Sequence, residues 1–270
     1  MWKFLCFLTI LPLFISCEKV IDLDLNTAEP LFVVEATILK DSVCTVELTR
    51  TANYFSTDDP EYIEDAEITI SDGISFEVLN YRERGIYEGS TIKGIEGRMY
   101  EIYISQNGID YEGASYLATA PDIISTSYNI YEEQSHLNPF GDRVVDVSCR
   151  FSDDISTDNY YIIRFSDENG KIIEKYFLLT ENESNSGSLN YENGEIHFTE
   201  SLFYEGNYIE VKLFSVDEAV YNYYLQLTDI LFWKRRIVPP TPYNPLSNIS
   251  NGALGYFAAW SFDTETLIIE

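Results

Sequence analysis

The chain has 270 residues, with 45 Asp and Glu against 17 Lys and Arg, and therefore a formal net charge of −28 at pH 7. Nucleic acids and anionic lipid surfaces bind basic patches, so this charge argues against both as partners. Aromatic residues make up 15% of the chain and are interspersed with the acids. This pattern excludes a disordered acidic tail and favours a folded body that its charge keeps soluble.

The first 16 residues have the pattern of a secretory signal peptide. Lys3 supplies a positive charge, residues 4–15 form a short apolar core, and Ser16 is the small residue at the cleavage position. A helix needs about 20 apolar residues to cross a bilayer, so this run is too short to span one. We therefore expect residues 1–16 to be removed.

Cys17 directly follows the cleavage position. The sequence Phe14-Ile15-Ser16-Cys17 resembles a bacterial lipobox, with Phe14 where Leu is usual. In a lipobox the cysteine is acylated and becomes the first residue, and several acyl chains give stable anchoring. The sequence thus predicts lipidation at Cys17, a tether over residues 17–30, and a protein held to a membrane by this cysteine.

Short strands are predicted after the tether. Runs of β-branched and aromatic residues separated by turn residues are typical of an antiparallel sandwich. Such runs occupy residues 31–39, 43–49, 66–71, 75–79 and 99–105. Asp72-Gly73 predicts a hairpin over residues 66–79. We assign residues 31–120 to a first β-sandwich domain.

A second series of strands begins after Pro121, which interrupts the pattern and marks a predicted domain boundary. Asn169-Gly170 predicts a hairpin, whereas the polar residues 181–194 predict an exposed loop. We assign residues 121–270 to a second β-sandwich domain. The predicted fold is therefore mainly β, with two antiparallel sandwiches of the immunoglobulin or fibronectin kind. The runs of the second series are 124–132, 143–151, 159–167, 171–179, 195–201 and 207–216.

The two cysteines of the predicted body, Cys44 and Cys149, share the core-facing parity of their strands. An exported protein can form disulfides. Because these cysteines lie in separate predicted domains, buried free thiols are the favoured interpretation.

One amphipathic helix is predicted over residues 217–236. Ser215 and Glu218 fit a capping box at its start, and Pro239-Pro240 prevents its continuation. We expect its aromatic stripe to pack on the second sandwich, and the apolar residues 252–260 to form a buried last strand. The stripe consists of Val220, Tyr224, Leu227 and Leu231.

No catalytic or cofactor-binding residues are predicted, because the sequence contains no serine-hydrolase elbow, zincin helix or P-loop pattern. Asp153, Asp154 and Asp158 are weak calcium candidates, since calcium prefers hard oxygen ligands. They lack the spacing and the glycine of a known calcium loop, so a solvated turn is favoured and no metal is expected.

Several segments resemble a single bacterial family. They are Cys17–Leu23, Pro30–Ala36, Ile63–Ile70, Gly85-Ile86-Tyr87, Gly97 with Tyr100, Tyr111, Tyr221–Tyr224 and Asn251–Phe257. On these segments the chain is identified as a member of the Bacteroidota outer-membrane lipoproteins known as domain-of-unknown-function family 4249. The resemblance implies an outer-membrane lipoprotein, often encoded beside a TonB-dependent receptor. It implies no catalytic residues.

The expected function is that of a non-enzymatic accessory or binding component at the outer membrane. A TonB-dependent transporter is its expected partner on the strength of the resemblance alone, and the ligand is unknown. An adhesin or surface-structural protein is the alternative that tandem sandwiches leave open. A less favoured alternative is a hydrolase with a catalytic triad built from residues distant in the sequence.

Overall fold

The structure is a computed structural model that describes residues 29–52, 59–131, 143–154, 156–173, 177–179, 188–204, 206–231 and 243–270. The predicted signal peptide, Cys17 and most of the tether lie outside these residues. In the described part, strands dominate and α2 (Glu218–Leu231) is the one helix, which confirms the mainly β prediction. Within the same residues, no helix combines the length and apolarity needed to cross a membrane.

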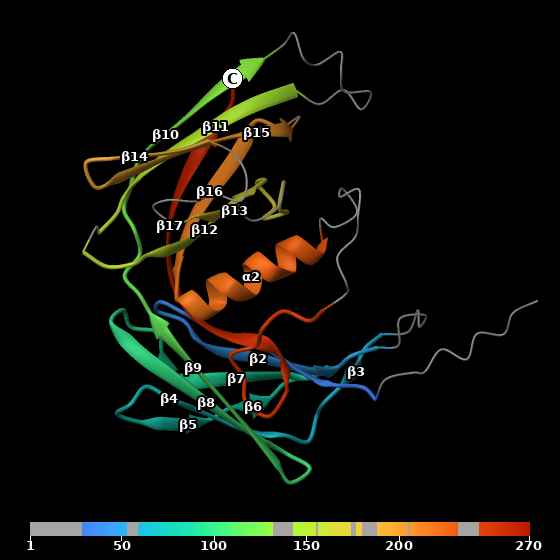
Figure 1. The fold of residues 1–270 in the computed structure, drawn as a ribbon. Coiled ribbons are helices and arrows are strands. Elements are labelled where there is room, and N and C mark those ends of the chain that lie inside the picture. The colour runs from blue at the N-terminus through green and yellow to red at the C-terminus, as the bar shows by residue number, and fades with distance from the viewer. Residues whose placement is uncertain are drawn as a thin grey trace, which may run out of the picture.

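The strands form three sheets (Figure 1). In chain order they are β1 (Phe32–Leu39), β2 (Val43–Arg50), β3 (Glu61–Tyr62), β4 (Glu67–Ser71), β5 (Phe76–Val78), β6 (Asn80–Tyr81), β7 (Ile86–Lys93), β8 (Arg98–Gln106), β9 (Ile109–Leu117), β10 (Ile123–Tyr131), β11 (Arg143–Ser152), β12 (Tyr160–Ser166), β13 (Phe177–Leu179), β14 (Ser188–Glu192), β15 (Glu195–Tyr204), β16 (Tyr208–Val216) and β17 (Leu254–Ile268).

A nine-stranded sheet runs through the whole molecule in the order β13-β12-β16-β17-β1-β2-β7-β6, with β3 beside β2. The four-stranded sheet β5-β4-β8-β9 and the part of the large sheet around β1, β2 and β7 make up the first half. The four-stranded sheet β10-β11-β15-β14 and the part around β12 and β16 make up the second half. Figure 1 shows the first half below the second.

The last strand, β17, belongs to both halves. Its first part pairs in parallel with β1, from Val33 opposite Leu254 to Leu39 opposite Trp260. Its second part pairs antiparallel with β16, ending with Tyr208 opposite Ile268. The prediction of purely antiparallel sheets is therefore wrong at β1 and β17. Parallel strands need a long connection between them, and here more than half of the chain supplies it.

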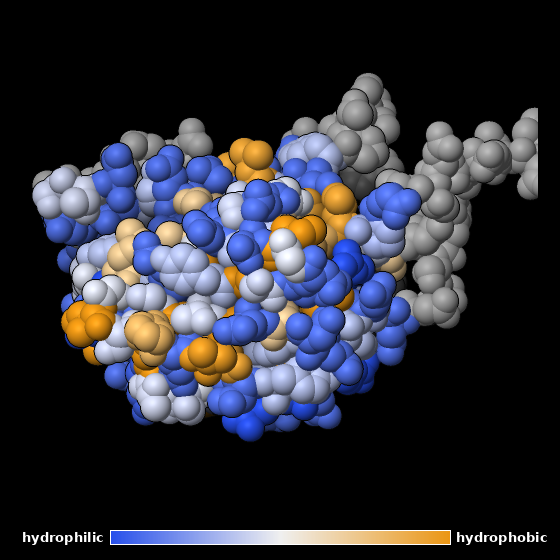
Figure 2. Space-filling view, turned by 90° about the horizontal axis from the view of Figure 1, so that it is seen from below, coloured by the Kyte–Doolittle hydropathy of each residue, from blue (hydrophilic) through white to orange (hydrophobic). Residues whose placement is uncertain are grey.

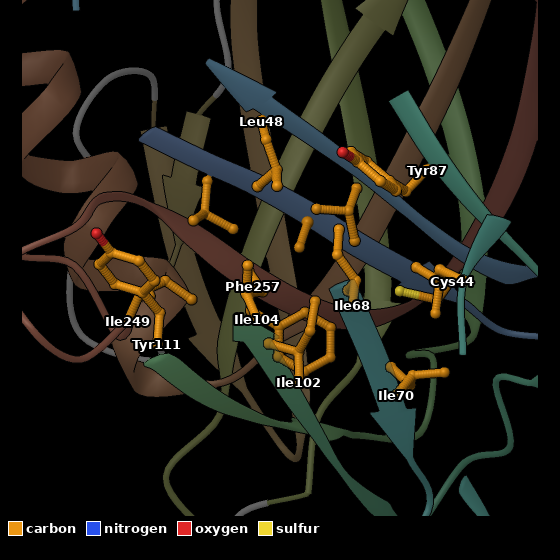
Figure 3. Packing of buried hydrophobic residues seen from close by; sticks show 14 of the residues in the cluster. Cys44, Leu48, Ile68, Ile70, Tyr87, Ile102, Ile104, Tyr111, Ile249 and Phe257 are labelled. Carbon is orange, nitrogen blue, oxygen red and sulfur yellow. The ribbon is translucent and has the colours of Figure 1, made fainter. Parts of the chain in front are cut away.

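The first hydrophobic core lies between the β5-β4-β8-β9 sheet and β1, β2 and β7. Alternate residues of these strands point inward, as the period of two in a strand requires. Ile249 and Phe257 lie in this core among Ile68, Ile102 and Ile104 (Figure 3). The segment 249–259, which the sequence analysis assigned to the second domain, thus completes a core otherwise built from residues 32–117.

The second core lies between β11 and β15 on one side and β12 and β16 on the other. It contains Cys149, while Cys44 lies in the first core. Both thiols are buried and free, as predicted. Burial raises the pKa of each to about 12. Because the thiolate is the reactive form, both cysteines are unreactive core residues at neutral pH.

Two hairpins are confirmed and one predicted loop is wrong. β4 pairs with β5 around Asp72-Gly73, and the chain reverses at Asn169-Gly170, where Ile173 N–H bonds to the Phe165 carbonyl at 3.0 Å. Residues 188–192, predicted as part of a loop, form β14 and pair with β15. Because its composition is mostly polar, this strand could not be recognised from the sequence. It is stabilised by backbone pairing and by the half-buried Leu189.

Helix α2 packs on the large sheet through a third cluster of apolar and aromatic residues. Val220, Tyr221 and Tyr224 are its buried residues, and they meet Ile162, Phe214 and Ala258 of the sheet. Tyr160 and Tyr221 rings lie 5.1 Å apart. The predicted extension to residue 236 lies outside the described residues.

Gly255 is a position where only glycine fits. Its φ is +89°, and a Cβ there would lie 1.9 Å from the Val34 carbonyl oxygen of β1. Gly252 also has a positive φ, +74°, but nothing lies within 4 Å of its Cβ position. The two glycines therefore separate backbone strain from a clash with the neighbouring strand.

We predict that Gly255→Ala lowers the free energy of unfolding by about 3 kcal/mol or more, because the methyl group pushes β1 and β17 apart. Gly252→Ala should cost only about 1–2 kcal/mol, the cost of a left-handed conformation for alanine. Equilibrium unfolding in urea measures both. Equal losses in the two variants would contradict a close approach of these strands.

Candidate functional site

A cavity of about 670 Å³ lies where the two halves meet. It is formed by the connection between β9 and β10, the loop between β11 and β12, and the turn from β16 into α2. We call it the junction cavity. Small-molecule sites are typically 300–1,000 Å³ in volume and often lie between structural units, so this is the candidate site.

Asp217 holds the wall of the junction cavity together. Its Oδ1 accepts the Val220 N–H at 2.9 Å and so caps α2. Its Oδ2 accepts hydrogen bonds from the Ser115 hydroxyl and from the Tyr116 N–H at 3.2 Å, both on β9. One carboxylate therefore ties the helix of the second half to a strand of the first.

The predicted helix cap is wrong by two residues, and the helix begins at Glu218, one residue after the predicted start. Ser215 was expected to cap the helix, but it is buried in β16 and pairs opposite Ser261. Asp217 caps the helix instead. Both residues are good N-caps in isolation. The second carboxylate oxygen of Asp217 can also reach β9, and this tertiary contact lies beyond the reach of a local pattern.

The junction cavity carries negative charge. Five of its lining residues are acidic and none is Lys, Arg or His. Hydrogen bonds from Ser156 hold the pKa of Asp154 below its usual range. Burial, followed by the charges of Glu218 and Asp158, raises the pKa of the Tyr160 hydroxyl. The cavity thus presents acidic side chains beside the protonated Tyr160 hydroxyl, which disfavours anionic ligands. Its acidic residues are Asp122, Asp154, Asp158, Asp217 and Glu218.

The weak calcium candidates lie in the loop between β11 and β12, and Asp154 and Asp158 line the cavity. Asp153 Oδ1 accepts hydrogen bonds from the Tyr161 hydroxyl at 2.6 Å and from Asn159 Nδ2 at 3.1 Å. Asp154 Oδ1 accepts the Ser156 N–H at 2.9 Å. Within the described ranges, no group of three or more His, Cys, Asp or Glu side chains could hold a metal ion.

A carboxylate with a strongly lowered pKa lies elsewhere, between the sheets of the first half. Glu77 on β5 accepts backbone hydrogen bonds from β7, including Thr91 N–H at 3.1 Å and Ile92 N–H at 2.8 Å. Burial alone would raise the pKa of Glu77. Hydrogen bonds from Ile92, Ser90 and Thr91 outweigh burial and lower this pKa to about 2. Glu77 is therefore a structural clamp.

Residues of the family-like segments also serve the fold. The Tyr87 hydroxyl donates to the Ile63 carbonyl at 3.0 Å and accepts the Ala66 N–H at 3.1 Å. The Tyr100 hydroxyl donates to the Lys93 carbonyl at 3.0 Å and accepts the Ile95 N–H. Each buried tyrosine thus fixes a loop that crosses an edge of the first core.

The outer face of the β5-β4-β8-β9 sheet exposes apolar side chains. Figure 2, which views the molecule from the side of this sheet, shows orange apolar residues among blue polar ones. Phe76 is 80% exposed and Val78 is 52% exposed. A hollow of about 410 Å³ lies at the β9 end of this face, between Tyr103, Glu112 and Ser250.

The fold and the cavity define a class of protein. In its described residues it is mainly β, with three sheets and with helix α2 packed on the largest of them. The sequence profile of the family described as Domain of unknown function (DUF4249) matches residues 18–266. The chain belongs to this family. None of the curated proteins matches it.

Solved structures resemble the chain only weakly. A pullulanase from Anoxybacillus sp. LM18-11, in complex with maltotriose, is 9% identical with a TM-score of 0.21, over 67% of this chain and 24% of its own. The titin domains Z1Z2 in complex with telethonin are 8% identical with a TM-score of 0.21, over 90% of this chain and 98% of their own. The chain therefore spans about a quarter of the length of the pullulanase.

We predict that Asp217→Asn lowers the free energy of unfolding by about 1–2 kcal/mol, because the amide can still cap α2 but leaves the Tyr116 N–H without its charged acceptor. Asp217→Ala should cost about 1 kcal/mol more, because the cap is lost as well. Asp158→Asn removes the same charge from the cavity wall and should change stability by less than about 0.5 kcal/mol. Equal effects of the two Asn variants, measured by urea unfolding, would contradict the bridge.

Glu77 should make the free energy of unfolding depend on pH in the acidic range. Its pKa is about 2 in the folded chain and about 4.3 in the unfolded chain, so its contribution is complete above pH ~4.3 and is lost as pH falls towards 2. Glu77→Gln should therefore be less stable than the native chain at pH 7, and the difference should shrink between pH 5 and pH 2. Glu112→Gln, on the exposed face of β9, is the control and should show no such trend. Urea unfolding across this pH range tests both.

Proposed function

We propose that this protein is a lipid-anchored component of the outer membrane that faces the cell surface and acts, without catalysing a reaction, as an accessory or binding partner of a TonB-dependent transporter. The observation that carries the proposal is the sequence Phe14-Ile15-Ser16-Cys17, which places an acylatable cysteine directly at the predicted cleavage position. The transporter comes from the family resemblance.

The start of β1 is well placed to carry an anchor. Leu31 N–H bonds to the Thr51 hydroxyl, and the Thr51 N–H bonds to the Leu31 carbonyl, each at 2.9 Å. The chain is therefore fixed to β2 at the point where the tether joins the body. A lipid at Cys17 would hold the folded body within a short chain length of the membrane.

Two features support a binding role. The junction cavity has the volume of a small-molecule site. The outer face of the β5-β4-β8-β9 sheet exposes Phe76 and Val78, and exposed apolar patches often mark protein contacts. We also interpret the two halves as two β-sandwich domains of the immunoglobulin-like kind that share β17.

The test compares Cys17→Ser with Cys6→Ser in the full chain carrying a C-terminal affinity tag. The native chain and Cys6→Ser should stay with outer membranes after a high-salt wash, and Cys17→Ser should be released, because only Cys17 carries the acyl chains. Capture of the native chain from detergent-solubilised outer membranes should recover a TonB-dependent β-barrel.

The membrane fractionation and the affinity capture test the anchor and the partner independently. A Cys17→Ser chain that stays with washed membranes would overturn the lipid anchor. Repeated capture without a β-barrel receptor would overturn the partner and favour the adhesin alternative, which binding to a panel of host glycans would then examine.

A further inference from the structure

Strand β10 is a free sheet edge of unusual composition. It lies at the end of the β10-β11-β15-β14 sheet and pairs with β11. Its nine residues, IISTSYNIY, include no charged residue and no proline, in a chain of which 23% is charged. Proteins usually protect exposed edges with charges, prolines or very short strands, because a bare edge can pair with another strand.

The other edges in the described part of the chain are protected in these ways. β3, β5, β6 and β13 are only two or three residues long. β9 carries Asp110 and Glu112, β14 carries Glu192, and the second part of β17 carries Asp263 and Glu265. β10 is therefore the long uncharged edge among the described strands.

The open side of β10 has unpaired backbone groups. At its start the Ile123 N–H donates to Asp263 Oδ2 at 2.8 Å. Beyond Ile123, no backbone group of the strand bonds to anything but β11 within the described residues. Such a row of donors and acceptors fits an added strand.

Antiparallel pairing of β10 with a second copy of itself opposes no charges. With Ser127 on a twofold axis, the copy places Ser127 opposite Ser127 and Ser125 opposite Asn129, which are exposed, and Thr126 opposite Tyr128, which are half-buried. The register of β10 is irregular between Ile123 and Ser125, so the matched pairs begin at Ser125. Residues directly opposite in an antiparallel pair point to the same face, so each of these pairs is in contact range.

We propose that β10 is a homodimerisation strand. Two copies of the chain pair antiparallel through β10 about an axis at Ser127, and their two four-stranded sheets become one continuous sheet. A contact of one strand with its own copy is isologous and closes after two subunits, so it yields a dimer rather than a fibre. The proposal does not depend on the lipid anchor or on the transporter.

Charge sets the conditions for this dimer. Each copy carries a formal charge of −28, and the neighbouring edge of β17 contributes Asp263 and Glu265. The repulsion between copies acts over the Debye length, which falls from about 30 Å at 0.01 M to about 8 Å at 0.15 M salt. Dimer formation should therefore increase with salt, whereas pairing through opposite charges would decrease.

The test places a cysteine on the axis. Ser127→Cys in the full chain should form a disulfide between copies in membranes of expressing cells, because residues opposite in a sheet have Cβ atoms about 4.5–5.5 Å apart, near the separation a disulfide needs. Cys44 and Cys149 are buried and do not compete. The native chain gives the background from any other cysteine. Asn190→Cys, on the opposite edge of the same sheet, is the matched control.

Under mild oxidation, Ser127→Cys should give a dimer band, removed by reductant, at least about ten times stronger than Asn190→Cys, and the band should grow with added salt as the charge is screened. Equal bands for the two variants indicate random collision and would overturn the proposal. So would the lack of a dimer band for Ser127→Cys at every salt concentration.

A pair of variants in the Ser127→Cys background tests the register. Ser125 and Asn129 are exposed and face each other across the proposed axis. Ser125→Asp with Asn129→Asp places like charges opposite each other and should reduce cross-linking about tenfold. Ser125→Lys with Asn129→Asp places opposite charges there and should retain it. Equal cross-linking of the two double variants would overturn this register, and with it the proposed dimer.

Discussion

The structure depends on one strand that pairs with two partners. β17 lies beside β1 for its first part and beside β16 for its second, so a single run of backbone crosses from one half of the molecule to the other. Its side chains enter both cores, with Phe257 in the first and Leu267 in the second. The relative position of the halves is therefore set by a continuous hydrogen-bonded strand, which is stiffer than a linker.

Polar contacts reinforce this strand where the connection between the halves passes it. The Ser261 hydroxyl donates to the Ala118 carbonyl at 2.7 Å, and the Ala259 N–H donates to the Ser115 hydroxyl at 2.8 Å. The Ser115 hydroxyl in turn donates to the carboxylate of Asp217, which lies at the start of α2. The wall of the junction cavity is thus built on a fixed frame, which is the condition for a preformed binding site.

Local patterns were sufficient for most strands and for the first half of the helix, because alternation in β1 and the positions of Val220 and Tyr224 in α2 reflect the face that each element buries. The predicted stripe is wrong at Leu231, which is 63% exposed. Three features were out of reach. The partner of β1 lies more than 200 residues away, β14 is polar apart from Leu189, and the choice of Asp217 over Ser215 as helix cap depends on β9. Each is decided by a contact distant in sequence.

The junction cavity is likewise formed by segments that lie far apart in the sequence. Its lining residues come from β9, the loop before β12, and the β16–α2 turn, and no segment among them carries a catalytic or ligand-binding motif. The weak calcium candidates were found because acidic residues cluster in sequence, yet two of them lie in this cavity for reasons of topology. Sequence patterns identified the chemistry of these residues but not their common location.

The dual pairing of β17 also governs the order in which the chain can fold. Synthesis delivers the polypeptide from its N-terminal end, and β1 precedes the other described strands. Its neighbour on one side is the last strand of all, and Phe257 and Ala259 fill a core whose other members precede residue 118 or adjoin the last strand. The first core cannot be completed until nearly the whole polypeptide has been synthesised. It therefore stays incomplete while the residues of the second half are added. Contacts of such long sequence separation slow folding, and delivery as an unfolded chain followed by folding of both halves together suits this topology.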